Sequence, residues 1–200
     1  MKIIMVNGVA RSGKDTLIQE LSRNLSFNNE YICLTYSTID EVKRLAKTLG
    51  WNGEKTEKSR KFLCDLKKLW TDFNNGPNND VLKKVISKNT YEDILGKEYI
   101  IFIQCREPAG IDFFKESFKK RNIDCRTILV LREDVEIPDN PADNNVFDYS
   151  YDYYINNNKD IYSYYGKIEE LKDKLKEDLM IGVMTLVFYV RISQMKLEKN

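Results

Sequence analysis

The first sixteen residues constrain the fold more than any other part of the chain. "KIIMVN" (residues 2–7) is an apolar run without polar alternation, which predicts a strand buried on both faces of a sheet. Gly8 follows directly, and after Lys14 the apolar residues recur at the spacing of an amphipathic helix. A buried strand that passes through a glycine turn into a helix is the first half of a βαβ unit. This opening therefore predicts an α/β fold around a parallel sheet.

The rest of the chain continues the alternation. Apolar runs predict further strands at residues 31–37, 99–105, 126–132 and 151–157. Helical patterns predict helices at residues 40–49, 53–73 and 108–121, and from about residue 161. The stretch 74–80 is expected to break the long helix, with a short helix following at 80–88. We predict a three-layer α/β domain with a central, mostly parallel sheet of about five strands.

One domain over residues 1–178 suits the length of 200 residues. Within it, 51–75 is a candidate acceptor-side helical segment, and the polar, Pro-containing loop 133–150 has the composition of a lid. Residues 179–200 form an apolar, then charged tail. Its apolar run of 12 residues, 179–190, is shorter than the roughly 18–20 that cross a bilayer. It predicts packing against the domain or a homodimer contact through the C-terminal helix, with membrane-surface attachment as the alternative.

Composition excludes several classes of site. The net charge of +1 provides no overall field for a nucleic-acid polymer, so any anion site must be local. The chain has no His and no C-x-x-C pair among its four Cys, which excludes the usual zinc frameworks and His-assisted nucleophiles. The cysteines are expected to be core thiols of a reducing compartment, and the N-terminus lacks a signal-peptide pattern. We therefore expect a cytoplasmic protein without a transmembrane span.

From Gly8 to Lys14 the sequence has the G-x-x-x-x-G-K spacing of a phosphate-binding loop, placed between a strand and a helix as that motif requires. The glycines allow backbone N–H groups to converge on phosphate oxygens, and the helix N-terminus adds partial positive charge. Lys14 is predicted to reach the β and γ phosphates of ATP. The alternative is a tight turn with an exposed lysine. The predicted ATP-binding residues of the loop are Gly8, Ala10, Arg11, Ser12, Gly13, Lys14, Asp15 and Thr16.

Asp15 occupies the position where the motif has a Ser or Thr hydroxyl on Mg²⁺. Mg²⁺ accepts one or two carboxylates, so Asp15 is a candidate metal ligand, directly or through water. The alternative is an Asp that only caps the helix. Thr16 lies about 100° further round the helix than Asp15, so its hydroxyl cannot take the place of the one that the motif has at position 15. The strand-end Asp that usually helps to hold the metal is missing after the third strand, where Glu107 is the nearest carboxylate and a second candidate ligand.

Several cations are expected at the same edge of the sheet. Arg106 follows the third strand and Arg132 ends the fourth, so both are candidates for contacts with transferring or acceptor phosphates. Arg106 and Glu107 could instead form an ordinary surface pair. In the helix predicted at 53–73, Arg60 and Lys61 lie beside an apolar face and are candidates for binding the acceptor. The members of that face are Phe62, Leu66, Leu69 and Phe73.

The segment "GVARSGKDT" resembles the loop of bacteriophage-type deoxynucleoside monophosphate kinases and of animal-type phosphomevalonate kinases, both of which carry Asp after the loop Lys. The resemblance implies a P-loop NTPase, nucleoside monophosphate kinase-like fold and a working ATP site. It also implies acceptor-side roles for Ser37 and Lys43, and it matches Asn157 to a late strand motif. "WNGEK" at 51–55 is similar to a segment of phosphomevalonate kinases. These families tend to end the third strand in Asp, whereas this chain has Gln104.

The expected function is an ATP- and Mg²⁺-dependent phosphotransferase that acts on a small phosphorylated acceptor, a (deoxy)nucleoside monophosphate first of all. Lys14, Asp15, Arg106 and Arg132 are its candidate catalytic residues. The absence of His costs little, because a phosphate acceptor is already anionic and phosphoryl transfer depends mainly on positioning and charge neutralisation. A phosphomevalonate-type kinase is one alternative. The other is an NTP-binding regulatory or scaffold protein without turnover.

Overall fold

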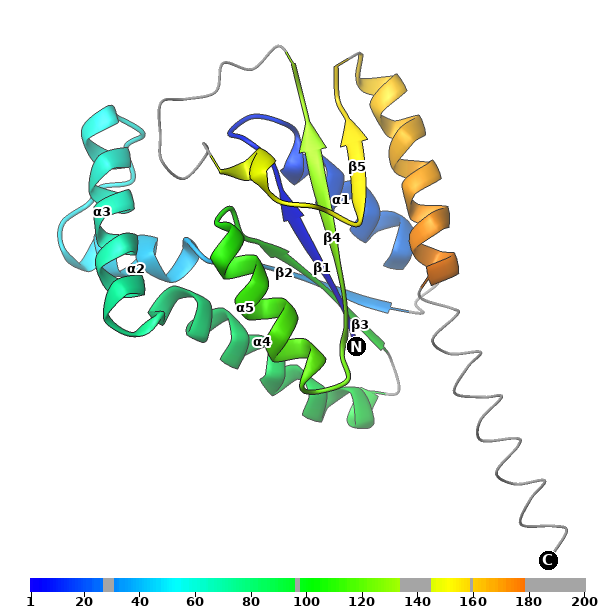
Figure 1. Cartoon of the computed structure of the whole chain (residues 1–200), viewed down its shortest axis with the longest axis horizontal. Coiled ribbons are helices and arrows are strands. Elements are labelled where there is room, and N and C mark those ends of the chain that lie inside the picture. Colours follow the sequence, from blue (N-terminus) through cyan, green and yellow to red (C-terminus); the bar gives the residue numbers. More distant parts are fainter. Residues whose placement is uncertain (27–30, 96–97, 134–144, 159, 179–200) are drawn as a thin grey trace, which may run out of the picture.

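The computed structural model of the chain describes residues 1–26, 31–95, 98–133, 145–158 and 160–178. Its centre is a five-stranded sheet in the order β2-β3-β1-β4-β5, and every neighbouring pair is parallel (Figure 1). The strands are β1 (Lys2–Asn7), β2 (Tyr31–Ser37), β3 (Glu98–Gln104), β4 (Asp124–Leu131) and β5 (Tyr153–Asn156). The prediction of an α/β fold with about five strands is confirmed, and the sheet is wholly parallel.

Helices connect the strands and cover both faces of the sheet. They are α1 (Lys14–Ser26), α2 (Asp40–Thr48), α3 (Glu57–Asn74), α4 (Gly76–Leu95), α5 (Pro108–Lys119), the short 3-10 helix η1 (Val146–Asp148) and a helix over residues 161–178. No helix of the described segments has both the length and the apolar character needed to cross a membrane. The tail 179–200 and most of the loop 133–150 lie outside the described residues, so the homodimer and lid expectations stay untested.

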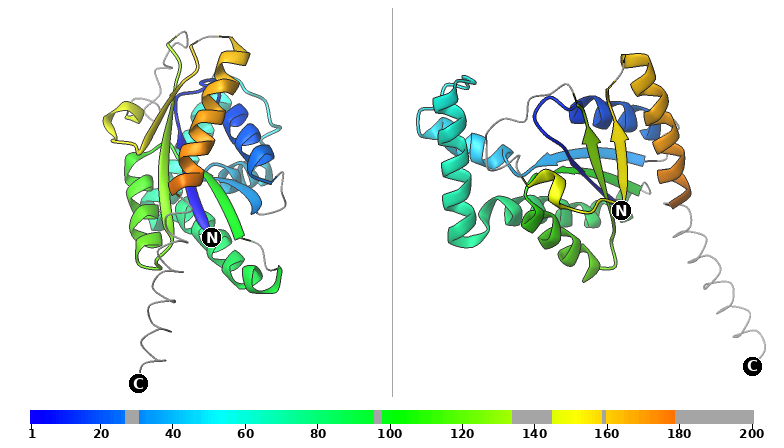
Figure 2. Two further views of the ribbon diagram at one scale, coloured as in Figure 1. Left: turned by 90° about the vertical axis from the view of Figure 1, so that its right-hand side faces the viewer. Right: turned by 45° about the horizontal axis from the view of Figure 1, so that its top comes forward.

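Two apolar cores form because side chains of a strand alternate between the faces of the sheet. All six residues of β1 are buried; Ile4 and Val6 belong to the core under α1 and helix 161–178. Ile3 and Met5 belong to the opposite core, under α4, α5 and η1. The arrangement has three layers, with the sheet between the two sets of helices (Figure 2). A continuous apolar run is what a strand buried on both faces requires, as the sequence predicted.

The carboxyl ends of all five strands meet at one edge of the sheet, called here the carboxyl edge. β1 and β3 are neighbours, but β1 leads into α1 on one face and β3 leads into α5 on the other. In open α/β sheets the crevice between two such strands is where ligands bind. The loop after β1 and the residues after β3, β4 and β5 all lie along this edge.

The helical segment after α2 differs from its prediction in two ways. α4 begins at Gly76, immediately after Asn75, whose φ of 54° ends α3, and it runs for 20 residues. The predicted break over 74–80 is present at Asn75, but the helix that follows starts earlier and is longer than the short helix predicted at 80–88. Gly76 lies tightly against Trp70, since a Cβ there would come 1.8 Å from the indole nitrogen. Pro77 then falls in the first turn, where its missing N–H costs nothing.

α3 begins at Glu57, where the Thr56 hydroxyl accepts a hydrogen bond from the Ser59 N–H at 3.2 Å. None of its side chains is fully buried. Leu69 and Phe73 of the predicted apolar face are 69% and 81% exposed. Leu66 of that face is half-buried, and Leu63, Lys67 and Trp70 are half-buried as well, so the face that α3 turns toward the protein only partly coincides with the predicted apolar face.

Candidate functional site

The loop between β1 and α1 has a backbone that needs glycine at two positions. Gly8 has φ 145° and Gly13 has φ 103°, both in the region that side chains rarely adopt. A Cβ on Gly8 would lie 2.6 Å from both Ser12 Oγ and the Val130 carbonyl oxygen, and one on Gly13 would lie 2.4 Å from Asn157 Nδ2. The two glycines of the motif are therefore required by conformation and by space.

Three side chains hold this loop in position. Asn7 is 1% exposed, and its Oδ1 accepts a hydrogen bond from the Gly8 N–H at 2.7 Å. Asn157 Nδ2 donates to the Ser12 carbonyl at 2.9 Å, and the Tyr164 hydroxyl donates to the Gly13 carbonyl at 3.2 Å. Burial raises the pKa of Tyr164, which keeps its hydroxyl protonated and able to donate. Contacts from the end of β1, from the residue after β5 and from helix 161–178 thus hold the loop.

Lys14 begins α1 and places its ammonium beside the loop. Its Nζ donates to the carbonyl oxygens of Gly8 and Val9, each at 2.7 Å. Asp15 and Thr16 lie in the first turn of α1, where backbone N–H groups have no intrahelical acceptor and the helix carries partial positive charge. Together these features make an anion-binding site of the kind found at helix N-termini.

A hollow of about 350 Å³ opens in front of the loop. It is lined by Arg11, Gly13, Lys14, Asp15, Thr16, Arg132, Asn157, Ile161 and Tyr164. Its volume falls in the range of small-molecule sites, and its lining residues include one lysine and two arginines. Arg132 Nη1 lies 3.5 Å from the Arg11 carbonyl oxygen, which brings the end of β4 to the loop. The hollow is therefore suited to a polyanion with several phosphates.

Most of the predicted ATP-binding residues line this hollow, but not all of them. Gly8, Ala10 and Ser12 are not among the lining residues. Ser12 Oγ is fully buried and has no hydrogen-bond partner among the described residues. Asn157 lies at the hollow, yet its amide nitrogen holds the loop. Tyr164 was not predicted; its helix was expected, but nothing in the pattern indicated a contact with the loop.

Asp15 is joined to the end of β3. Gln104 Nε2 donates to Asp15 Oδ1 at 2.8 Å, so the strand end that lacks an Asp supplies an amide to the loop carboxylate. The described residues contain no cluster of three His, Cys, Asp or Glu that could hold a metal alone. A Mg²⁺ ion bound with a nucleotide needs only one or two carboxylates besides phosphate and water oxygens. Asp15, exposed at the hollow, fits that requirement.

Glu107 is in a different situation from Asp15. Its two carboxylate oxygens accept hydrogen bonds from Lys67 Nζ at 2.6 and 2.7 Å, and the same ammonium donates to Thr38 Oγ1 at 3.0 Å. Lys67 is 16% exposed and reaches the carboxyl edge from α3. A metal ion at Glu107 would have to compete with this ammonium. The metal role predicted for Glu107 remains a prediction, and Asp15 is the better candidate.

The predicted acceptor residues are dispersed. Lys43 on α2 and Arg60 on α3 are exposed, and Lys61 pairs with Asp65 at 3.6 Å along its own helix. The backbone N–H of Ser37 donates to Asp40 Oδ2 at 3.0 Å.

Arg106 is half-buried directly after β3, and its carbonyl oxygen accepts a hydrogen bond from Asn7 Nδ2 at 3.0 Å.

Lys67 is a residue of this edge that the sequence did not single out. Its spacing from Leu63 and Trp70 places the three on one helical face, and that spacing could have identified it.

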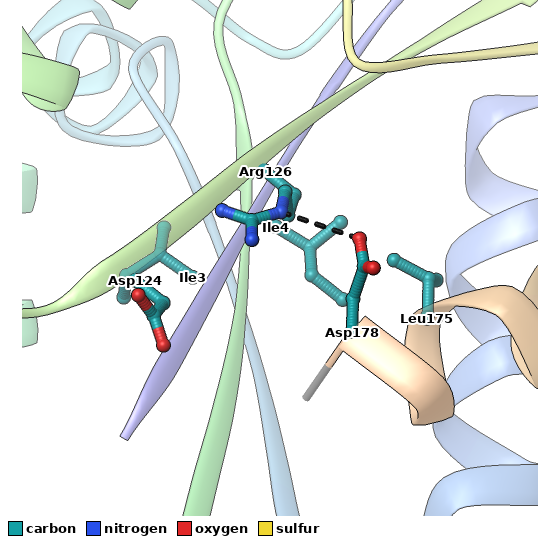
Figure 3. Close-up of a pocket in the computed structure, with 6 residues that line it drawn as sticks. All are labelled: Ile3, Ile4, Asp124, Arg126, Leu175 and Asp178. Atoms are coloured by element: carbon teal, nitrogen blue, oxygen red, sulfur yellow. Dashed lines mark hydrogen bonds and ion pairs between the residues drawn. The ribbon is translucent and has the colours of Figure 1, made fainter. Parts of the chain in front are cut away.

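A second, much smaller cavity lies at the opposite end of the sheet (Figure 3). Its volume of about 10 Å³ holds at most one water molecule. Arg126 Nε lies 3.4 Å from Asp178 Oδ2, which ties the end of helix 161–178 to β4. Lys2 pairs with Asp124 at 2.6 Å, and this hydrogen bond lowers the pKa of the Asp124 carboxyl group. These contacts are structural, and the hollow at the carboxyl edge is the candidate ligand site.

The sequence matches no protein-family model, and no curated protein matches it. Among solved structures, an APS kinase from Mycobacterium tuberculosis in complex with AMPPNP and APS aligns at a TM-score of 0.45 with 10% identity, covering 88% of this chain and 97% of that one. A thymidylate kinase from Ehrlichia chaffeensis aligns at 0.45 with 14% identity, covering 89% and 98%. A shikimate kinase from Bacteroides thetaiotaomicron aligns at 0.42 with 14% identity, covering 88% and 98%. Because each TM-score lies below 0.5, we draw no conclusion about this chain from these similarities.

Proposed function

We propose that this chain is an ATP-dependent phosphotransferase of the P-loop kinase type that acts on a small phosphate-bearing acceptor. The observation that carries the proposal is the loop Gly8–Lys14, held by side chains from three elements and opening on a hollow with three cationic groups. A tight turn with an exposed lysine would need neither these contacts nor the convergence of Arg11 and Arg132 on Lys14.

The chemistry asks for positioning and charge neutralisation more than for a base. Lys14 and the first turn of α1 would bind the β and γ phosphate oxygens. Arg132 and Arg11 line the same hollow and would contact the same phosphates. Bound Mg²⁺ supplies positive charge between phosphate oxygens, and Asp15 would hold it. No histidine is needed for these roles.

The acceptor would lie along the carboxyl edge between the loop and α3. Arg106 and Lys67 bring two cations to that edge, and both suit an acceptor that carries a phosphate. A (deoxy)nucleoside monophosphate is the first acceptor to test, and phosphomevalonate is the second. The acceptor-side roles predicted for four further residues stay hypotheses. These residues are Ser37, Lys43, Arg60 and Lys61.

A regulatory NTP-binding protein without turnover is the second candidate function. Two observations favour it: Gln104 stands where a strand-end carboxylate is usual, and Glu107 is engaged by Lys67. Both candidates bind the nucleotide at the same loop. The two candidate functions differ in whether a phosphoryl group is transferred from the bound nucleotide to an acceptor.

The deciding experiment measures ADP release from ATP and Mg²⁺ in the presence of nucleoside monophosphates, deoxynucleoside monophosphates or phosphomevalonate. Acceleration by one acceptor, lost in Lys14→Met and retained in Lys68→Met, supports the kinase. Lys68 is the matched control because it is exposed and pairs along α3 with Asp72 at 2.6 Å. Tight ATP binding that no acceptor converts into ADP release favours the regulatory protein. Unchanged ADP release in Lys14→Met would overturn the assignment of the loop.

A further inference from the structure

Gln104 is fixed by its backbone at the centre of the carboxyl edge. It is the last residue of β3 and pairs with Val6 of β1 on one side and Ser37 of β2 on the other. Its carbonyl oxygen also accepts a hydrogen bond from the Thr38 N–H at 3.2 Å. The half-buried side chain therefore starts from a rigid position and reaches Asp15 on α1, where Nε2 lies 2.8 Å from Oδ1.

The residue type at position 104 matters because of this distance. A carboxylate there would face the Asp15 carboxylate at hydrogen-bond range, and two such groups resist being ionised together unless a proton or a cation lies between them. An amide instead donates a hydrogen bond to Asp15 Oδ1 and adds no second negative charge. The pair therefore keeps one negative charge at the loop and fixes the direction in which that charge points.

We propose that Gln104 is a positioning residue that orients the Asp15 carboxylate toward the metal ion of a bound metal–nucleotide complex. The proposal rests on the proposed function, because it assigns the metal side of the same site. It explains the two departures from the usual loop together: the carboxylate lies on the helix rather than on the strand end, and the strand end supplies the amide that aims it.

The fold does not rest on this contact alone, because a second amide joins the loop to the segment that follows β3. Asn7 Oδ1 accepts from the Gly8 N–H at 2.7 Å, while its Nδ2 donates to the Arg106 carbonyl at 3.0 Å and to the Tyr151 hydroxyl at 2.7 Å. The loop and the end of β3 thus stay in register when the side chain of Gln104 changes. Substitution at Gln104 tests the orientation of Asp15 rather than folding.

The test uses Mn²⁺ as a paramagnetic probe and ADP as the nucleotide. Free Mn²⁺ is measured by electron paramagnetic resonance with ADP and the full-length parent, Gln104→Met or Gln19→Met. Gln19 is the matched control, because it is an exposed glutamine on α1. We expect Gln104→Met to weaken Mn²⁺ binding to the ADP complex by about five- to tenfold, as loss of one hydrogen bond implies. Binding of ADP in EDTA should change less than about twofold.

A double-mutant cycle separates positioning from a general structural effect. Asp15→Asn removes the carboxylate, so adding Gln104→Met to it should weaken Mn²⁺ binding no further. Losses that add in the double variant, or Mn²⁺ binding that is unchanged in Gln104→Met, would overturn the proposal while leaving ADP binding and the proposed function intact. A parent protein that binds no ADP, with or without Mn²⁺, would contradict the proposed function itself.

Discussion

Lys67 Nζ lies 2.6 and 2.7 Å from the two carboxylate oxygens of Glu107, so an ion pair joins α3 to the carboxyl edge of the sheet. α3 has no fully buried side chain of its own. It is also bounded by residues in the left-handed region, Gly53 with φ 94° before it and Asn75 with φ 54° after it. The position of α3 over the proposed acceptor edge therefore depends strongly on this ion pair.

Lys67→Met is expected to lower the free energy of unfolding by about 1–2 kcal/mol, since it leaves the partly buried Glu107 carboxylate without its partner. Lys68→Met removes an exposed lysine one residue away and should change stability by less than about 0.5 kcal/mol. Urea unfolding of the two variants and the parent measures the difference. Equal losses in both variants would mean that the Lys67–Glu107 contact contributes nothing specific.

Gly8→Ala tests whether the loop needs glycine as strictly as its geometry implies. The added methyl group would lie 2.6 Å from Ser12 Oγ and from the Val130 carbonyl, at a φ of 145°. We expect a loss of about 1–3 kcal/mol in stability together with loss of ATP binding. Gly166→Ala is the control, because a Cβ there meets nothing within 4 Å and the residue lies in helix 161–178. That variant should gain about 0.5–1 kcal/mol.

A Gly8→Ala protein that binds ATP like the parent would contradict the geometry of the loop. Isothermal titration with ATP and Mg²⁺ measures the affinity, and thermal unfolding measures the stability of the same samples.

The sheet could be predicted because each of its strands is an apolar run that needs no partner to be recognised. β1 and β3 are nearly continuous in Val, Ile, Met, Phe and Tyr, so burial on both faces followed from the sequence. The loop could be predicted for a similar reason: the spacing of Gly8, Gly13 and Lys14 is local. Such local patterns can be recognised in the sequence without knowledge of the tertiary contacts.

What could not be predicted depends on contacts between distant parts of the chain. Lys67 and Glu107 are 40 residues apart, and Gln104 and Asp15 are 89 apart. Asn7 was expected only as the end of a strand, although its side chain ties the loop to the end of β3. A polar side chain shows its partner only when the fold brings the two together. The same holds for Gly76, whose close approach to Trp70 no local pattern indicates.

Tyr164→Phe tests the support that helix 161–178 gives to the loop. The ring is 1% exposed in the core under α1, and Phe keeps that packing while removing the hydrogen bond to the Gly13 carbonyl. We expect ATP to bind about three- to tenfold more weakly, and stability to fall by about 1 kcal/mol. Tyr162→Phe, at an 81% exposed position of the same helix, should bind ATP like the parent. Equal ATP affinities in both variants would show that the Tyr164 hydroxyl does not contribute to ATP binding.

Cys105 gives the protein a defined alkaline sensitivity. Burial raises the pKa of its thiol from 9.0 to about 12, with the Glu107 charge as a smaller cause in the same direction. Above pH 9 the unfolded chain therefore loses a proton that the folded chain keeps. The stability linked to this thiol is fully present below pH 9 and is lost as the pH rises to about 12. One such group contributes a slope of about 1.4 kcal/mol per pH unit in that interval.

Cys105→Ala should remove this contribution, so its free energy of unfolding should fall less steeply between pH 9 and 12 than that of the parent. The pKa of Cys125 is also raised to about 12 by burial, so Cys125→Ala should reduce the slope in the same way. Val85→Ala, a truncation in the same core without a titratable group, should lower stability and leave the slope unchanged. Urea unfolding at several pH values gives each slope. A parent slope that persists in Cys105→Ala would show that this thiol is not the group that titrates.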